Sequence, residues 1–163
     1  LNGLLYSKDY SNLELCPTGL KGVISISEET KNISNYAFFN CKCIKEIQRK
    51  GNKPISIEEA AFYGCENLEK IEFADFIEDV GSCAFAKCIS LEEFTIGKNM
   101  QSIGSSAFLG CKSLKTVKSL AENFKIGHNI FNSCRQIIAI LAPKNSSMAK
   151  YVSKHPERLV LVV

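Results

Sequence analysis

The sequence predicts an α/β solenoid: a right-handed superhelix with one parallel β-sheet and short helices or turns on the opposite side. One phrase, apolar-x-x-x-Ala/Ile-Phe-x-x-Cys-x-x-apolar-x-x-apolar, occurs five times. Its phenylalanines are separated by 24, 23, 23 and 23 residues; they are Phe38, Phe62, Phe85, Phe108 and Phe131. A fixed period in the low twenties is typical of solenoids, in which each repeat buries its apolar face against its neighbours. Right-handed connections between parallel strands are the rule.

The first half of each repeat has the apolar spacing of a short helix. In the fourth repeat the apolar residues fall at i, i+4, i+5 and i+8 within residues 103–111. Ser105 and Ser106 are residue types that cap helices. We therefore expect a short helix here in every coil.

The second half of each repeat has the alternation of a strand. Residues 91–96 place Phe94 and Ile96 on one face and Glu93 and Thr95 on the other. A Gly-Lys-Asn turn follows. Each coil is expected to contain a strand, a turn, an extended link and a short helix.

We expect a single domain over residues 1–163, taken from a longer protein because the chain opens on Leu1 without a leader. Residues 1–32 are expected to hold a hairpin-like segment and a first coil. Five repeats of 23–24 residues then fill positions 33–142. A C-terminal cap covers 143–163.

The ends are predicted to differ from the middle. Two antiparallel strands are expected on either side of a polar turn at residues 8–12, and residues 23–26 supply the first coil strand. Near the C-terminus, Ser146 or Ser147 caps a helix that runs to about His155. Residues 159–163 read as a final strand.

Two irregularities stand out among the repeats. The second unit is one residue longer, and residues 51–54 are expected to bulge there. In the fifth unit Ser119 occupies a slot that is apolar in its neighbour. Leu120 or Phe124 is expected to fill the space.

Five of the eight cysteines occupy the same slot of successive repeats: Cys41, Cys65, Cys88, Cys111 and Cys134. Equal slots stack into a ladder, and we expect these thiols to be buried and reduced. Rungs about 4.8 Å apart would be close enough to bridge, so disulfides remain the alternative. Five in a line cannot all pair. Cys16, Cys43 and Cys83 receive no role.

The composition disfavours several classes of function. The net charge is +3, and residues of both signs are interspersed along the chain. We therefore expect no nucleic-acid partner. No apolar run approaches the ~20 residues of a membrane span, so no direct membrane insertion is expected. Asn32 and Asn145 begin glycosylation sequons, which matter only in a eukaryotic secretory pathway.

No catalytic or cofactor motif is found, and we expect no enzyme, no cofactor and no metal. His128 and His155 lack a second ligand at metal spacing. A ladder cysteine beside His128 could imitate a nucleophile pair, but a buried thiol is inert. The remaining alternative is that this chain is part of an enzyme whose catalytic domain lies outside this sequence.

A solenoid binds most often through its extended concave surface. From the strand alternation, two rows of side chains are predicted there: Glu46, Lys70, Glu93, Thr116 and Ala139, and Gln48, Glu72, Thr95, Lys118 and Leu141. The first four of each row are the candidate binding residues. The competing interpretation is that the alternating charges only pair across adjacent strands, worth at most ~1 kcal/mol each.

The repeated phrase resembles the BspA-like leucine-rich repeats of surface proteins from anaerobic bacteria and some parasitic protists. The resemblance covers residues 33 to about 142, and the ladder cysteines match the Asn/Cys slot of the repeat. Residues 5–17 look like the family's inter-array segment, and residues 143–151 look like its C-terminal cap. Departures are modest: Ile130 replaces Ala, and Val80 replaces Ile.

The resemblance implies a non-enzymatic interaction module of a cell-surface or secreted protein. Its expected role is adhesion to a protein or glycoconjugate on host or neighbouring cells, strengthened by avidity over many repeats. The alternative is a structural spacer array that displays other domains and has no ligand of its own.

Overall fold

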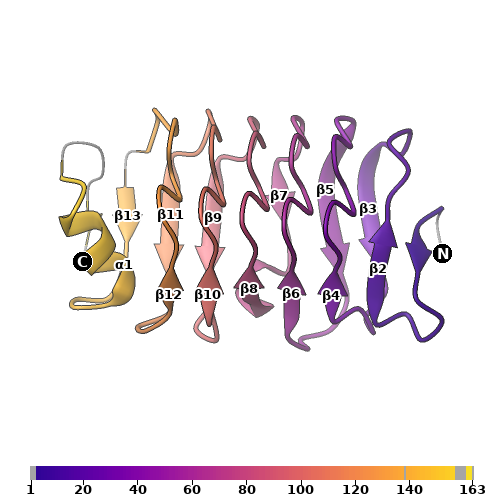
Figure 1. Ribbon diagram of the computed structural model, residues 1–163, viewed down its shortest axis with the longest axis horizontal. Helices are drawn as coiled ribbons and strands as arrows, with labels where there is room; N and C mark the ends of the chain where they lie inside the picture. The colour runs from indigo at the N-terminus through magenta and orange to yellow at the C-terminus, as the bar shows by residue number, and fades with distance from the viewer. Residues whose placement is uncertain (1–2, 138, 157–160, 163) are drawn as a thin grey trace.

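The computed structural model describes residues 3–137, 139–156 and 161–162, which form a β-solenoid whose coils stack side by side (Figure 1). Each regular coil contributes one strand to each of two opposite faces. The front face in Figure 1 is a seven-stranded sheet in the order β1 (Leu5–Tyr6), β2 (Asn12–Leu15), β4 (Asn32–Ile33), β6 (Ile55–Ile57), β8 (Ile77–Val80), β10 (Ser102–Ile103) and β12 (Lys125–Ile126).

The opposite face, which we call the strand face, consists of two sheets. The three-stranded sheet holds β3 (Gly22–Ile26), β5 (Ile44–Arg49) and β7 (Lys70–Ile71). The four-stranded sheet has the order β14 (Leu161–Val162), β13 (Ala139–Leu141), β11 (Thr116–Ser119) and β9 (Glu93–Ile96). A 3-10 turn, η1 (Ala74–Phe76), lies between β7 and β9.

The solenoid prediction is confirmed, but two details of each coil were wrong. A single sheet was expected, whereas the extended links also pair from coil to coil and build the seven-stranded sheet. Ile103, expected to open a helix, lies in β10 and pairs with Val80 and Ile126 of the neighbouring coils. The right-handed course of the superhelix stays a prediction.

The expected short helix is a series of turns. Two residues of each turn segment, such as Ser106 (φ 56°) and Gly110 (φ 70°), have left-handed backbone, which interrupts an α-helix. The amide of Phe108 therefore bonds to the carbonyl of Ile130 in the next coil at 2.9 Å, while Leu109 bonds back to Ser106. Backbone groups that a helix would satisfy internally are satisfied between coils instead.

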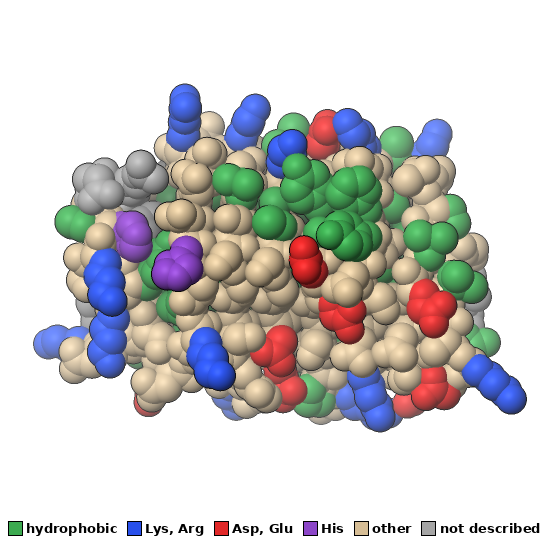
Figure 2. Space-filling model, in the orientation of Figure 1, with side chains coloured by type: hydrophobic (Ala, Val, Ile, Leu, Met, Phe, Trp, Pro, Cys, Tyr) green, Lys and Arg blue, Asp and Glu red, His purple; other side chains and the backbone are tan. Residues whose placement is uncertain are grey.

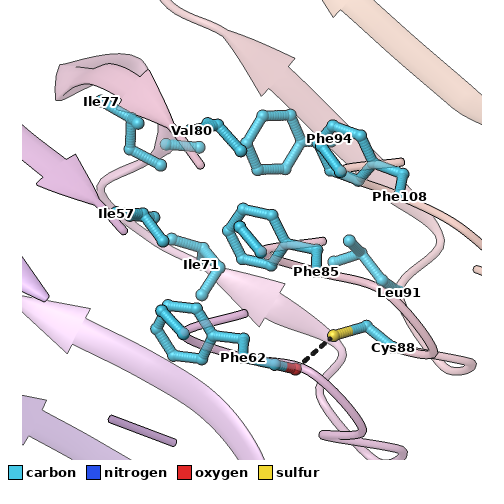
Figure 3. Close-up of a cluster of buried hydrophobic side chains, with 14 of the residues drawn as sticks. Ile57, Phe62, Ile71, Ile77, Val80, Phe85, Cys88, Leu91, Phe94 and Phe108 are labelled. Carbon is cyan, nitrogen blue, oxygen red and sulfur yellow. Dashed lines mark hydrogen bonds between the residues drawn. The ribbon is translucent and has the colours of Figure 1, made fainter. Parts of the chain in front are cut away.

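The core is a column of stacked rings, as predicted (Figure 3). Phe85 lies between Phe62, at a centroid distance of 5.3 Å, and Phe108, at 5.4 Å, with the planes nearly parallel. Phe94 from β9 approaches Phe85 and Phe108 from the side, at 5.3 and 4.8 Å. All four side chains are almost fully buried.

The cysteine ladder hydrogen bonds to the phenylalanine column. The Cys88 thiol donates to the carbonyl of Phe62 in the preceding coil at 3.2 Å (Figure 3). The same carbonyl also accepts the amide of Cys65 at 3.2 Å. Equivalent thiol bonds run from Cys65 to Phe38, from Cys111 to Phe85 and from Cys134 to Phe108.

All eight cysteines are free thiols in the structure, and four of the five ladder thiols are buried as predicted. Cys134 is only partly buried, because it belongs to the last repeat before the cap. Burial raises the pKa of the Cys65 and Cys88 thiols, which keeps them protonated. The exposed thiol is Cys43.

The ends of the solenoid follow the prediction closely. β1 and β2 pair antiparallel, and the helix α1 (Ser147–Ser153) has Ser146 as its N-cap, whose hydroxyl accepts the amide of Ala149 at 3.1 Å. The helix ends before the expected His155. β14 pairs parallel with β13; residues 157–160 and 163 of the expected final segment lie outside the described residues.

The two irregular coils have clear local causes. Residues 51–54 form an exposed loop, and Arg49 beside it donates to the carbonyls of Lys53 and Glu28 at 2.7 and 3.2 Å. Ser119 is buried and donates to the carbonyl of Ala121 at 3.1 Å. Of the two residues expected to compensate, Leu120 is 42% exposed, whereas Phe124 is partly buried and packs against the core.

Replacing Phe85 by alanine is expected to destabilise the solenoid by ~3–5 kcal/mol, because a fully buried ring with three ring neighbours leaves a cavity. Thr95→Ala on the strand face should change the free energy of unfolding by less than about 0.5 kcal/mol. Urea denaturation of the two variants measures both. Equal, small changes would show that the inward and outward faces are wrongly assigned.

Thiol labelling in the native state is expected to follow exposure. Cys43 should react with iodoacetamide first, Cys83 and Cys134 more slowly, and the buried ladder thiols only after unfolding. Mass spectrometry of peptides from native and denatured protein gives the order. Fast labelling of Cys65 or Cys88 in the folded protein would contradict a buried, protonated ladder.

Candidate functional site

A groove of about 830 Å³ runs along the strand face. Its lining comes from five successive coils and consists of Val23, Lys45, Glu46, Glu69, Lys70, Ser90, Glu92, Glu93, Ser113, Lys115 and Thr116. Consecutive outward residues line it, as in β5, where Lys45 and Glu46 lie between the buried Ile44 and Ile47. The hollow therefore lies where the concave binding surface was predicted.

The first four residues of the first predicted row line this groove, and Ala139 does not. Glu46 of β5 lies opposite Lys70 of β7 in the parallel register, and Thr116 of β11 lies opposite Glu93 of β9 and Ala139 of β13. The structure thus brings Glu46, Lys70, Glu93 and Thr116 together on one surface.

The second predicted row is less continuous. Lys118 lies opposite Thr95 and Leu141 in the sheet register. Gln48 belongs to β5, whereas Glu72 follows the end of β7. The break between the sheets therefore separates Gln48 and Glu72 from Thr95 and Lys118.

A smaller cavity of about 150 Å³ occupies that break. Its lining includes the acidic side chains Glu69, Glu72, Asp75 and Glu93 and the single cation Lys70. η1 diverts the chain here, and Gly97 packs against it so closely that a Cβ would overlap the Asp75 carbonyl. This break was not predicted from the sequence. In the structure, β7 has two residues and β9 has four.

Ion pairs join part of the two rows. The Lys70 ammonium is 3.0 Å from Glu72 and 4.0 Å from Glu46, and the Gln48 amide donates to Glu46 at 3.1 Å. The bond to Glu72 raises the pKa of Lys70, and it lowers the pKa of Glu72. Lys70 and Glu72 are 59% and 39% exposed, so their pair contributes little to stability.

One further charged position in each of four coils was not predicted from the sequence. Lys45 and Glu69 lie 3.7 Å apart, and Lys115 lies 3.1 Å from Glu92. Each residue comes directly before the predicted row of its coil. The missed signal is that charge recurs in this slot of successive repeats, whereas we had confined the surface to the strands themselves.

The residues considered for chemistry do not assemble into a reactive group. His128 is exposed, while the His155 ring stacks on Tyr151 and its Nδ1 lies 2.9 Å from the Tyr151 carbonyl. Among the described residues, no three His, Cys, Asp or Glu side chains are grouped as a metal site requires. Within the same residues, no helix has the length and apolar character needed to cross a membrane.

Three solved bacterial structures resemble this one in fold. A T. pallidum leucine-rich repeat protein superposes with a TM-score of 0.72 and 23% identity over 86% of this chain and 68% of its own. The pneumococcal vaccine antigen PcpA gives 0.76 and 20% over 100% of this chain and 46% of its own. A leucine-rich cell surface protein from Faecalibacterium prausnitzii gives 0.60 and 21% over 90% and 47%.

The chain thus spans less than half of two of these structures, and identities this low show the fold alone. No curated protein matches the sequence. The sequence profile of the BspA type leucine-rich repeat region, however, matches residues 19–148 in six copies. Because that match spans most of the chain, this protein belongs to the BspA-type leucine-rich repeat family.

Proposed function

We propose that this chain is a non-enzymatic adhesion module of a cell-surface or secreted protein, and that it binds a macromolecule of another cell along the strand-face groove. The observation that carries the proposal is the groove itself, which extends over five coils and is lined by side chains that the core does not use. Repeated contacts along such a surface add avidity to individually weak interactions.

The charges of the groove narrow the class of partner. The groove and the adjoining cavity together are lined by six carboxylates, Glu46, Glu69, Glu72, Asp75, Glu92 and Glu93. Only Lys45, Lys70 and Lys115 oppose them. This excess of negative charge favours a protein or a neutral glycoconjugate over a sulfated, anionic glycan.

A spacer without a ligand is the second candidate. It is favoured by the ion pairs of Lys70 and by the similar pairs at Lys45 and Lys115, which satisfy much of the groove's charge within the chain. In that case the charged rows only keep the surface soluble. The adhesive candidate is supported by two similar solved structures, one a leucine-rich cell surface protein and the other a vaccine antigen.

The deciding experiment is binding of this chain to an array of extracellular-matrix proteins, neutral glycans and sulfated glycans. The adhesive function predicts at least one protein or neutral glycan whose binding weakens as salt rises, since exposed charges are screened. Binding to no member of the array would favour the spacer.

For a partner found in this way, Glu93→Lys is expected to weaken binding about fivefold, because an exposed ion pair contributes up to ~1 kcal/mol. Glu93 lines both cavities and forms no ion pair with another described residue. Glu122→Lys, an exposed change of the same charge outside the groove lining, is the matched control. Equal losses in both variants would exclude the groove as the binding site.

A further inference from the structure

Three aromatic side chains form an exposed cluster on the face that Figure 2 shows, where the hydrophobic patch lies over the coils of β4, β6 and β8. We define the aromatic cluster as Tyr36, Phe39 and Tyr63, which lie in the turn segments after β4 and β6. Tyr36 is 50% exposed and Phe39 40% exposed, although both are large and partly apolar. The cluster is absent from the strand-face groove lining.

The rings are ordered against one another. Tyr36 meets Phe39 edge to face at 5.7 Å, and Phe39 stacks on Tyr63 at 5.3 Å with an interplanar angle of 14°. From the next coil, the Lys87 ammonium lies 5.1 Å from the Tyr63 ring centre. The cluster thus already holds one cation on a ring face, within the distance of a cation–π contact.

The solenoid does not require aromatic residues at these positions. The slot of Tyr36 recurs in every repeat with the same left-handed backbone and is filled there by Ala60, Cys83, Ser106 and Asn129. The slot of Phe39 and Tyr63 is filled in later repeats by Ala86, Leu109 and Asn132. All these coils fold alike, so the rings serve something other than the fold. Left-handed backbone is also uncommon for a bulky residue such as Tyr36.

Two carboxylates lie beside the Tyr36 end of the cluster. The Tyr36 hydroxyl lies 3.5 Å from Glu59 Oε1, and Glu58 accepts the amide of Asn35 at 3.0 Å. Neither carboxylate forms an ion pair with another described residue, whereas Lys42 nearby is paired with Glu66 at 2.6 Å. An added cation over Tyr36 and Phe39 would therefore meet two uncompensated carboxylates.

We propose that the aromatic cluster is a second interaction surface, which binds a protein segment through an arginine or lysine side chain placed over Tyr36 and Phe39 beside Glu59. Lys87 on Tyr63 shows the same contact within the chain. The charge beside the rings favours this occupant over a neutral sugar, because a sugar carries no charge that could pair with Glu59.

This surface is separate from the proposed groove, so the two can be tested independently. The probes are N-acetyl-arginine amide, its neutral isostere N-acetyl-citrulline amide, and cellohexaose, each titrated into the protein and followed by aromatic NMR signals. The arginine probe is expected to shift the Tyr36 and Phe39 signals, and the other two are not. Equal shifts with citrulline, larger shifts with cellohexaose, or no shift with arginine would each overturn the proposal.

The chain supplies its own matched variants. Tyr36→Ser and Phe39→Ala introduce residues that later repeats carry in the same slots, so both variants should fold with an unchanged urea midpoint. Each of these variants, and also Glu59→Gln, is expected to lower the affinity for the arginine probe about two- to fivefold, because one exposed cation–π contact or ion pair is lost. Glu93→Lys in the groove should leave it unchanged. Unaltered affinity in Tyr36→Ser and Phe39→Ala would refute the assignment, whatever partner the groove binds.

Discussion

The structure depends on hydrogen bonds that run from each coil to the next. Amides such as that of Phe108 bond to a carbonyl one repeat further along, and the thiol of Cys88 bonds to a carbonyl one repeat back. A buried backbone group without a partner is costly, so the repeat length is constrained wherever these bonds form. The cysteine is thus more than a small apolar residue, because its S–H satisfies the second lone pair of the Phe62 carbonyl.

The phenylalanine column and this ladder support one another. Stacking at 5.3–5.4 Å around Phe85 places the rings at nearly the separation of neighbouring strands. The same coil spacing brings the Cys88 thiol within reach of the Phe62 carbonyl. Cys134 is the last rung and has no further ladder cysteine beyond it, and it is more exposed than Cys88.

The interior side chains pack between coils, so only the outward side chains are available to contact a partner. Two regions of the surface differ in the side chains that they expose. The strand face carries charge of both signs in register over a groove, whereas the turn segments after β4 and β6 carry the cluster of Tyr36, Phe39 and Tyr63 beside Glu59. The two proposed surfaces would let the module hold two partners at once. Aromatic residues are the commoner anchors of protein interfaces.

The period of the phenylalanines and the alternation of residues 91–96 were enough to predict the solenoid, its core and the first row of groove residues, because those features follow from side-chain direction alone. The turns were mistaken for helices because the apolar spacing of residues 103–111 suits both, and only bonds to the next coil distinguish them. The break between β7 and β9 and the aromatic cluster were likewise missed. Both depend on which coils lie side by side: η1 separates two sheets, and Tyr63 meets Phe39 only when one repeat stacks on another.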